Sequence, residues 1–458
     1  MNVVEDKART AASWAAGDDG ATWTFRLALV LTIPVFYFVG RRQWFTRDDW
    51  AYVLSREAVR ANSGWQHWLF DAQDGHWLTI PVLVFHFTRE IFGLGSYWPF
   101  LLPAMASHVV AVLLTREVCK RLRVSPWNTT IVCAMLLVFG SGWDNIVFAI
   151  QISYNFSLVF FLAQFLLADH DGPVDRRDVI GAVLGVLGMM SSGFGPIFMV
   201  GVFVLLAFRR RWKAVLIAVV PQAVIYGWWL IFWATDNVAA ARPGDRAELP
   251  AYLARGVSAT FEAMVAIPAL SGLALLAALG VALWRGTAWR ARSMMIALWA
   301  TLGTMFLAIG WERIGFGVPT AASSRYLHIG AIVIAPVLAL AVDQLARLSS
   351  EARWAARIVL VMAVAVNASA LRTNSSRWAQ QARAEQDTFS LVAGSPEVLA
   401  VPVTRVMSPF SPNVTIQWIP TLISWNAITP RHPRDEREHH HVLVALGLAP
   451  PDTEPPSP

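Results

Sequence analysis

Two adjacent carboxylates, Asp48 and Asp49, stand just beyond the first long apolar run of the chain. Charge beside apolar sequence is costly unless it is solvated or used, and a carboxylate whose pKa is raised by burial can act as a general base. If Thr46 or Asp48 caps a helix that begins here, Asp48 and Tyr52 share one helix face. An acidic pair is also typical of an ordinary helix N-terminus, where the helix dipole favours negative charge. The charge pattern alone leaves both interpretations open.

A second candidate is the segment Ser323–His328, in which Arg325 and Tyr326 precede a later apolar run. A planar guanidinium matches phosphate oxygens, so Arg325 could bind a phosphate group with Tyr326 beside it. The alternative is an arginine that extends to a membrane interface and a tyrosine that anchors the helix there. We favour phosphate binding, because Arg325 is one of few basic residues that adjoin an apolar run on its side of the chain. Glu312 and Arg313 are more simply explained as an ion pair.

Three weaker candidates complete the set. Trp143 and Asp144 lie in a short polar turn, where the indole could stack on a sugar and the carboxylate could bind its hydroxyls; an ordinary turn fits equally well. His76, in the segment Asp74–Trp77, could assist the same site, although a lone histidine at a helix start is commonly structural. The run His439–His441 could suggest a metal, but its charged surroundings favour a solvated surface.

The composition decides which kind of protein must hold these residues. Of 458 residues, 56% are hydrophobic and only 15% are charged, and the mean hydropathy is +0.48. A soluble surface needs roughly 25% charged residues, so the composition excludes a soluble protein and predicts a membrane protein. The 22 tryptophans fit, because indoles collect at membrane interfaces. Two cysteines exclude a disulfide framework, and the N-terminus lacks the apolar stretch of a cleaved signal peptide.

The apolar runs are long enough to predict transmembrane helices, each needing about 20 residues. They cover 23–40, 96–118, 127–143, 146–168, 179–208, 215–234, 264–284, 294–311, 328–346 and 358–371. Basic clusters, which mark cytoplasmic loops, lie at 120–123, 176–177, 209–213, 285–292 and 347–357.

The clusters fall on one side only if each consecutive pair is separated by an even number of crossings. The run 179–208 must then break at Ser191–Pro196 and cross twice, with a half-crossing hairpin as the alternative. The result is about eleven transmembrane helices, with the N-terminus inside and the C-terminus outside. Arg41, Arg42 and Arg47 are the exception, because they lie on the outer side.

The expected architecture is an all-α polytopic membrane protein. Its parts are a cytoplasmic segment 1–22, a transmembrane domain 23–371 with a first outer loop 41–95, an outer region 372–449 and a disordered tail 450–458. Within the first outer loop, the segment 77–93 is too short and too charged to cross, which predicts an amphipathic interfacial helix. The basic charge follows the loops, so the composition gives no reason to expect nucleic-acid binding.

The layout resembles the GT-C glycosyltransferases, polytopic enzymes that use polyprenyl-phosphate-linked sugars outside the cytoplasm. The resemblance rests on the acidic pair Asp48-Asp49 after the first span, Tyr52, the interfacial helix, His76, and the Arg325-Tyr326 pair. It covers roughly 23–346, and the chain departs from the family in its C-terminal stretch, where no large folded domain is evident. The resemblance implies Asp48 as the base, Asp49 as an orienting group and Arg325 as the phosphate ligand.

The sequence therefore predicts a cell-membrane glycosyltransferase that transfers a hexose or pentose from a polyprenyl phosphate to a glycan, lipid or protein acceptor. It requires no cofactor, since arginine can neutralise the phosphate, although some relatives with acidic pairs use a divalent cation. A transporter or lipid flippase is the main alternative. An outer-face polymerase or ligase would instead centre on Arg242, Arg246 and Arg255. A protein that only binds or supports others is the remaining alternative.

Overall fold

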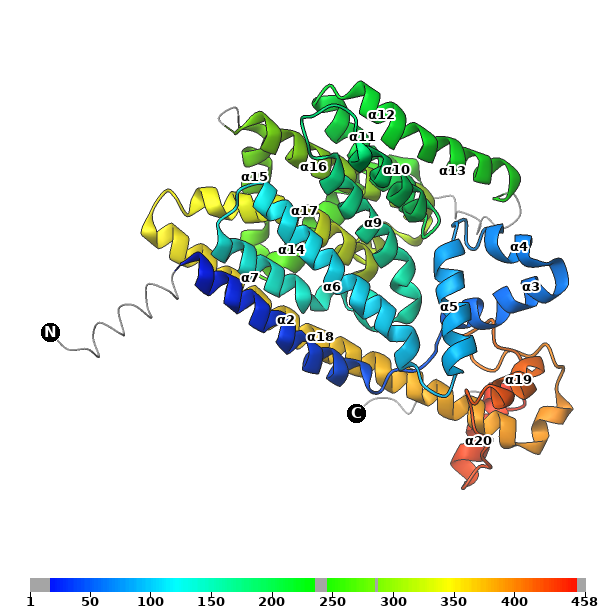
Figure 1. Ribbon diagram of the computed structural model, residues 1–458. Helices are drawn as coiled ribbons and strands as arrows, with labels where there is room; N and C mark the ends of the chain where they lie inside the picture. The colour runs from blue at the N-terminus through cyan, green and yellow to red at the C-terminus, as the bar shows by residue number, and fades with distance from the viewer. Residues whose placement is uncertain (1–16, 235–244, 285–286, 451–458) are drawn as a thin grey trace. The chain divides into compact units, whose positions relative to one another are not determined.

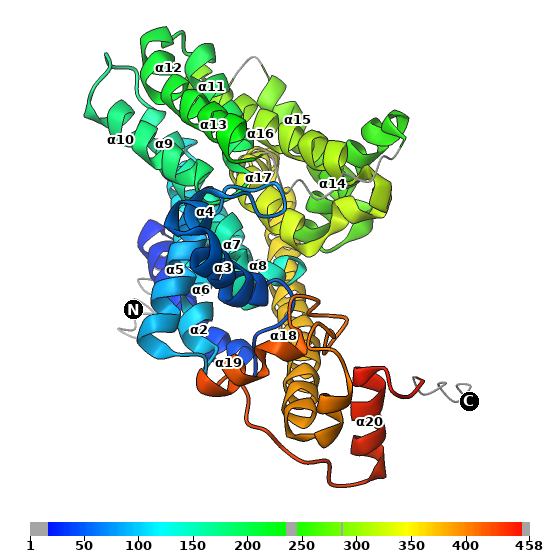
Figure 2. The same cartoon turned by 90° about the vertical axis from the view of Figure 1, so that its right-hand side faces the viewer.

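The computed structural model describes residues 17–234, 245–284 and 287–450 (Figures 1 and 2). All regular elements in these ranges are helices, which confirms the predicted all-α fold class. The chain divides into two compact units. The larger unit contains Met1–Phe38, Phe70–Ile80 and Ala104–Asn374, and the smaller unit contains Val39–Leu69, Pro81–Pro103 and Ser375–Pro458.

Seven helical segments in the described residues are long and apolar enough to cross a membrane, which identifies a multi-pass membrane protein. They are α2 (Asp18–Gly40), α6 (Trp98–Arg121), the α9 region (Ala149–Ala168), α12 with α13 (Trp212–Phe232), the α16 region (Trp289–Phe316), α17 (Ser324–Leu345) and α18 (Ser350–Gly394).

The predicted count of eleven spans is not confirmed. The run 127–143 forms a helix of only 12 residues, α7 (Pro126–Leu137). The helices α14 (Leu249–Val265) and α15 (Pro268–Leu283) belong to one apolar region that bends by 111°, and they raise the count to eight if taken as one broken span. Apolar sequence alone does not reveal where such a bend divides it.

The run 179–208 does break at the predicted place. Helix α10 (Arg176–Met189) ends before the turn, and α11 (Gly195–Phe208) begins with Gly195 and Pro196. Each helix has 14 residues and is therefore about 21 Å long, which is less than the ~30 Å hydrocarbon core. Whether the two helices cross twice or form a half-crossing hairpin remains a prediction.

Helix α17 forms the centre of the larger unit. Within its apolar window 94% of the residues are buried, because α7, α14, α15 and α16 all pack against it. The helix is correspondingly apolar on every face over most of its length. Figure 2 shows α9 and α10 side by side, and α14 lying next to α17 in agreement with their contacts. This packing fixes Arg325 and Tyr326, the second and third residues of α17, on a rigid element.

The smaller unit joins the first loop to the C-terminal stretch. Its helices include α3 (Arg56–Ser63), most of α5 (Thr79–Phe92), α19 (Ile419–Ser424) and α20 (Glu436–Leu446). Helix α5 confirms the helix predicted over 77–93. The C-terminal stretch is folded, which its sequence did not make evident, because α18 continues to Gly394 and the residues after it pack within this unit.

Three predictions fall wholly or largely outside the described residues. They concern most of the N-terminal segment 1–22, almost all of the tail 450–458, and Arg242.

Candidate functional site

Asp48 lies at the start of a helix in the smaller unit. The buried aromatic residues around it, Phe45 and Trp50, form a platform under its side chain. In the stretch 43–54 Asp48 is the one exposed residue, Arg47 is half-buried, and every other residue is buried. Trp50 and Phe45 beneath it are fully buried, with ring centroids 5.3 Å apart. The burial that we expected for a base is therefore found around Asp48 rather than at its own side chain. The platform holds one solvent-facing carboxylate in a fixed position.

The backbone on both sides of Asp48 departs from regular geometry. Arg47 has a φ of 50°, in the left-handed region, and its guanidinium stacks over the ring of Trp378 at 4.8 Å. The amide N–H of Arg47 donates to the hydroxyl of Ser411 at 2.7 Å. Residues Ala51–Ser55 then form a π-helical turn. Strained residues and π-turns both concentrate at functional sites, because only a reason beyond stability retains them.

Asp49 is fully buried, in contrast to its exposed neighbour Asp48. Its Oδ2 accepts hydrogen bonds from the hydroxyl of Tyr97 at 2.7 Å and from the amide of Thr46 at 3.3 Å. The hydroxyl of Thr46 donates to Glu385 at 2.6 Å. These bonds join the helix start to α18, so Asp49 supports the position of Asp48 from below.

We expect Asp49→Ala to destabilise the smaller unit by about 1–3 kcal/mol, because the buried hydroxyl of Tyr97 then loses this acceptor. Adding Tyr97→Phe should cost much less in the Asp49→Ala background than in the wild type. Thermal unfolding of the four proteins in detergent measures this coupling. Strictly additive losses would show that the bond does not support the fold.

Tyr52 lies within the π-turn and is buried, with only 4% of its surface exposed. Its ring packs edge-on against Phe85 at 5.1 Å. The predicted shared face of Asp48 and Tyr52 assumed an α-helix, and the wider π-turn alters that spacing. A substrate-binding role for Tyr52 remains a prediction.

His76 is held in the larger unit by a tight turn. Asp74 and Gly75 both have positive φ values, 51° and 78°, as a type I′ turn requires. The amide and carbonyl of Gln73 exchange hydrogen bonds with those of His76. The imidazole lies against Gly193, where an added Cβ would come within 2.3 Å of Nδ1. The turn and the missing side chain at Gly193 together place this ring.

Burial lowers the pKa of His76 from 6.5 to about 4; the charge of Arg313 adds to the decrease and Asp74 opposes it. The unfolded chain therefore binds more protons than the folded chain between these two values, so protonation of His76 favours unfolding there. We expect the unfolding free energy to fall by roughly 2–3 kcal/mol as the pH drops from 6.5 to 4. Above about pH 7 this contribution is constant.

His76→Asn should remove this part of the pH dependence, as measured by thermal unfolding between pH 4 and 8. His67→Asn, which changes an exposed histidine, is the control and should leave the profile unchanged. The assignment is wrong if the His76→Asn profile matches that of the wild type.

Arg325 is paired with Asp144 in the larger unit. Its Nε lies 3.9 Å from Oδ2 of Asp144, and the Arg325 side chain is 30% exposed. The hydroxyl of Ser324 accepts a hydrogen bond from the amide of Asp144 at 3.2 Å. Two contacts therefore join the turn at Trp143 to the start of α17, and they bring together residues that the sequence separated by 180 positions.

A chain of buried hydrogen bonds lies behind this pair. Asn145 Nδ2 donates to Nδ1 of His328 at 3.2 Å, and Nε2 of His328 lies 2.8 Å from Nδ1 of His108. Nε2 of His108 reaches the carbonyl of Leu137 at 3.4 Å, where it can only donate. With the proton of each neutral imidazole on Nε2, all three hydrogen bonds are satisfied in one direction, from Asn145 to Leu137. This network fixes α8 (Asp144–Val147) against α17.

Arg313 is the residue that the sequence interpretation undervalued. It lies at the end of α16, and its charge acts on His76, Tyr252 and Tyr326. Tyr326 is buried and lies 6.4 Å from Phe194, ring centre to ring centre, beside the Gly193 that contacts His76. The structure thus gathers Arg313, His76 and Tyr326 at one end of the larger unit. The available signal was that Arg313, like Arg325, adjoins a span on the side that the sequence predicts to be the outer one.

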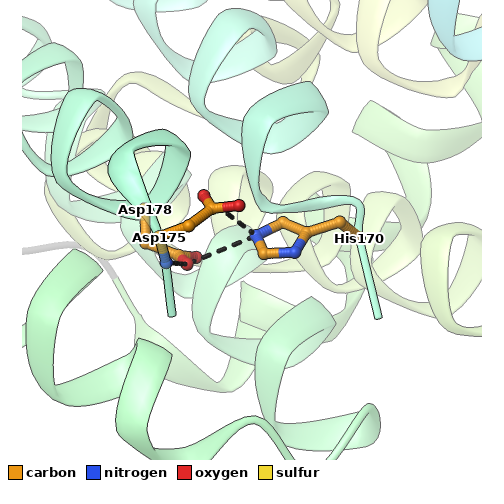
Figure 3. A group of neighbouring side chains, drawn as sticks. All are labelled: His170, Asp175 and Asp178. Atoms are coloured by element: carbon orange, nitrogen blue, oxygen red, sulfur yellow. Dashed lines mark hydrogen bonds and ion pairs between the residues drawn. The ribbon is translucent and has the colours of Figure 1, made fainter. Parts of the chain in front are cut away.

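The described residues hold one group with the spacing of metal ligands: His170, Asp175 and Asp178 (Figure 3). Nε2 of His170 lies 3.3 Å from Asp178 and 3.9 Å from Asp175. The guanidinium of Arg211 already lies 2.9 Å from Nε2 of His170 and 3.0 Å from Asp178. Hydrogen bonds from Arg177 lower the pKa of Asp175 to about 2. Since arginine supplies the positive charge here, we interpret the group as structural.

The histidine run lies on α20. His439 contacts Glu397 at 2.8 Å, and Nε2 of His441 lies 2.8 Å from the hydroxyl of Thr388. The described part of the chain does not gather these histidines into a group of metal ligands. Their partners are those of a solvated surface.

Comparison with known proteins gives the fold. No protein-family model and no curated protein matches the chain. The crystal structure of ArnT from Cupriavidus metallidurans bound to undecaprenyl phosphate is similar, with a TM-score of 0.54 at 13% identity over 91% of this chain and 87% of that chain. The apo structure of the same protein gives a TM-score of 0.54 at 12% identity, over 93% and 88%. The chain therefore shares the all-helical membrane fold of ArnT.

Proposed function

We propose that this protein is a membrane glycosyltransferase that moves a sugar from a polyprenyl phosphate to an acceptor hydroxyl outside the cytoplasm. The observation that carries the proposal is Asp48, a single exposed carboxylate on a buried, strained platform. The fold supports it, because a protein of similar fold binds undecaprenyl phosphate. The sugar would be a hexose or a pentose, and the acceptor a glycan, a lipid or a protein.

The proposed chemistry assigns one task to each group. The acceptor oxygen attacks the anomeric carbon while the bond from that carbon to the phosphate oxygen breaks. Asp48 accepts the proton of the acceptor hydroxyl. Arg325 binds the departing polyprenyl phosphate, which gains negative charge as it leaves. Asp144, at 3.9 Å, orients the guanidinium.

Three further groups have supporting roles in this proposal. Asp49 holds the helix start through Tyr97. His76, neutral at ordinary pH because its pKa is lowered to about 4, can exchange hydrogen bonds with a sugar without adding charge. Trp143 offers an aromatic face on which a sugar ring can stack.

One observation favours the transporter alternative. Ionisable residues inside a membrane usually mark an ion pathway, and His108 and His328 are both fully buried in spanning helices. Their ring nitrogens are all accounted for by Asn145, by each other and by Leu137. A structural role explains the pair without a transported ion.

The test reconstitutes the full chain in liposomes with a panel of polyprenyl-phosphate hexoses and pentoses. Glycosyl transfer releases free polyprenyl phosphate, which mass spectrometry detects, and the acceptor gains the sugar. A fluorescent lipid-scrambling assay on the same liposomes tests the alternative. Scrambling without release from any donor would overturn the proposal.

A further inference from the structure

A cavity of about 380 Å³ lies in the larger unit, at the opposite end of α17 from Arg325. It forms where the C-terminal ends of α6, α15 and α17 meet the N-terminal end of α16. Its lining residues include four arginines and no described acidic residue: Arg121, Leu122, Arg123, Trp284, Thr287, Ala288, Arg290, Ala291, Leu340, Gln344 and Arg347. Three of the five basic clusters of the sequence therefore contribute to one cavity.

Carboxylates beside this cavity already pair with Arg121 and Arg290: Glu117 lies 3.8 Å from Arg121, and Asp171 lies 3.1 Å from Arg290. Asp169, whose side chain is fully buried, contacts Arg121 at 3.0 Å and Arg290 at 3.3 Å. It also binds Arg209 at 2.5 Å, so three guanidinium groups share one carboxylate. Burial alone would raise the pKa of Asp169, but Arg209 and Arg290 together lower it. The carboxylate is thus ionised and already fully engaged.

Two arginines of the lining are less engaged. Arg123 has no carboxylate within ion-pair distance in the described part of the chain, and its side chain is exposed. Its φ of 59° places it in the left-handed region at the end of α6, where glycine is the usual residue. Arg347 reaches only Asp343, at 3.4 Å, and its side chain is 65% exposed. Both guanidinium groups can turn to an anion in the cavity.

Five of the other seven lining residues are apolar, and the two polar ones are Thr287 and Gln344. Leu122 and Leu340 are buried, whereas the indole of Trp284 is 60% exposed, as expected of a tryptophan at a membrane interface. A cavity with cationic and apolar walls, beside an interfacial tryptophan, matches an amphiphile better than a free ion. Basic pockets between membrane helices commonly bind lipid headgroups.

We propose that this cavity binds a phosphate group, supplied by the headgroup of an anionic phospholipid in the leaflet at the basic ends of these helices. The guanidinium groups of Arg123 and Arg347 bind the phosphate, and Trp284 with the leucines contacts the apolar part of the lipid. The site differs from the one proposed for transfer and does not depend on that function.

The experiment titrates the full-length protein in neutral detergent with phosphatidylglycerol, phosphatidylcholine or inorganic phosphate. The thermal unfolding midpoint and native mass spectrometry report binding. The test variant is Arg123→Gln/Arg347→Gln, and the matched control is Arg176→Gln/Arg353→Gln, which removes two exposed arginines outside the lining. We expect phosphatidylglycerol to stabilise the wild type and the control alike, and to bind the test variant at least about tenfold more weakly.

The two possible sources of the phosphate give different results. Binding of phosphatidylglycerol that Arg123→Gln/Arg347→Gln weakens, with little effect of inorganic phosphate, supports the lipid headgroup. Stabilisation by inorganic phosphate that the same variant abolishes keeps the phosphate site and makes its source soluble. If phosphatidylglycerol and inorganic phosphate each bind the test variant as strongly as they bind the wild type, the proposal is wrong.

Discussion

Asp48→Asn is expected to lower glycosyl transfer by about 10²–10⁴-fold, the contribution of a positioned general base. The amide keeps the size and the solvent-facing position of the carboxylate but cannot accept the proton of the acceptor hydroxyl. Because Asp48 is exposed, the substitution should change neither the platform beneath it nor insertion into the membrane. Turnover of the polyprenyl-phosphate sugar by purified protein, compared at saturating donor, measures the effect.

Asp387→Asn provides the matched control, since it removes another exposed carboxylate from the same unit. It should leave turnover unchanged. Unfolding midpoints of both variants should equal that of the wild type, which separates lost chemistry from lost structure. Full activity of Asp48→Asn would exclude Asp48 as the base, even if the protein proves to be a glycosyltransferase.

Features that depend on a few neighbouring residues could be predicted from the sequence. The Gly195-Pro196 pair ends one helix and starts another, so the break within 179–208 follows from local geometry. Apolar runs reflect the hydrocarbon core and basic clusters reflect the loops beside it. Both patterns therefore predict a multi-pass helical protein without knowledge of any distant contact. The helix α5 was predictable for the same reason.

Contacts between distant segments could not be predicted. The charge pattern presents Asp48 and Asp49 as equivalent carboxylates. Which of the two is buried depends on Tyr97, 48 positions away from Asp49, because its buried hydroxyl donates to the inward-facing carboxylate. The pairing of His108 with His328 spans 220 positions and leaves no local pattern. Arg313 was assigned to an ion pair with its neighbour, because nothing in the sequence shows that His76 lies within range of its charge.

The polymerase alternative makes a different prediction for Arg255 in α14 and for Arg246 in the 3-10 turn just before it. Arg255 lies 2.8 Å from Glu262, so its charge is already balanced within its own helix. Arg246 stacks over Trp311, with 3.7 Å between the guanidinium carbon and the ring centre. Both arrangements are sufficient reasons for an arginine to occur there. A reaction centred on these residues would need their guanidinium groups to leave these partners.

Arg325→Ala is expected to raise the KM for the polyprenyl-phosphate donor by about 10–100-fold, while the KM for the acceptor changes little. A hydrogen bond to a charged group contributes about 1.5–3 kcal/mol, and each 1.4 kcal/mol corresponds to a factor of ten. Arg325→Lys should recover only part of the affinity, because an ammonium group keeps the charge but loses the planar fork. Initial rates measured against donor and acceptor in turn give the two constants.

Arg255→Ala is the control for this prediction. It removes a cation from the same unit, and this cation already has a carboxylate partner in Glu262. If Arg325 binds the phosphate, only Arg325→Ala weakens the donor, and Asp144→Asn reproduces part of that loss by releasing the guanidinium. Equal losses for donor and acceptor in Arg325→Ala would point to a general disturbance of α17. A larger loss in Arg255→Ala would instead favour the polymerase alternative, since the energetic dependence would then follow α14 rather than the Asp144–Arg325 pair.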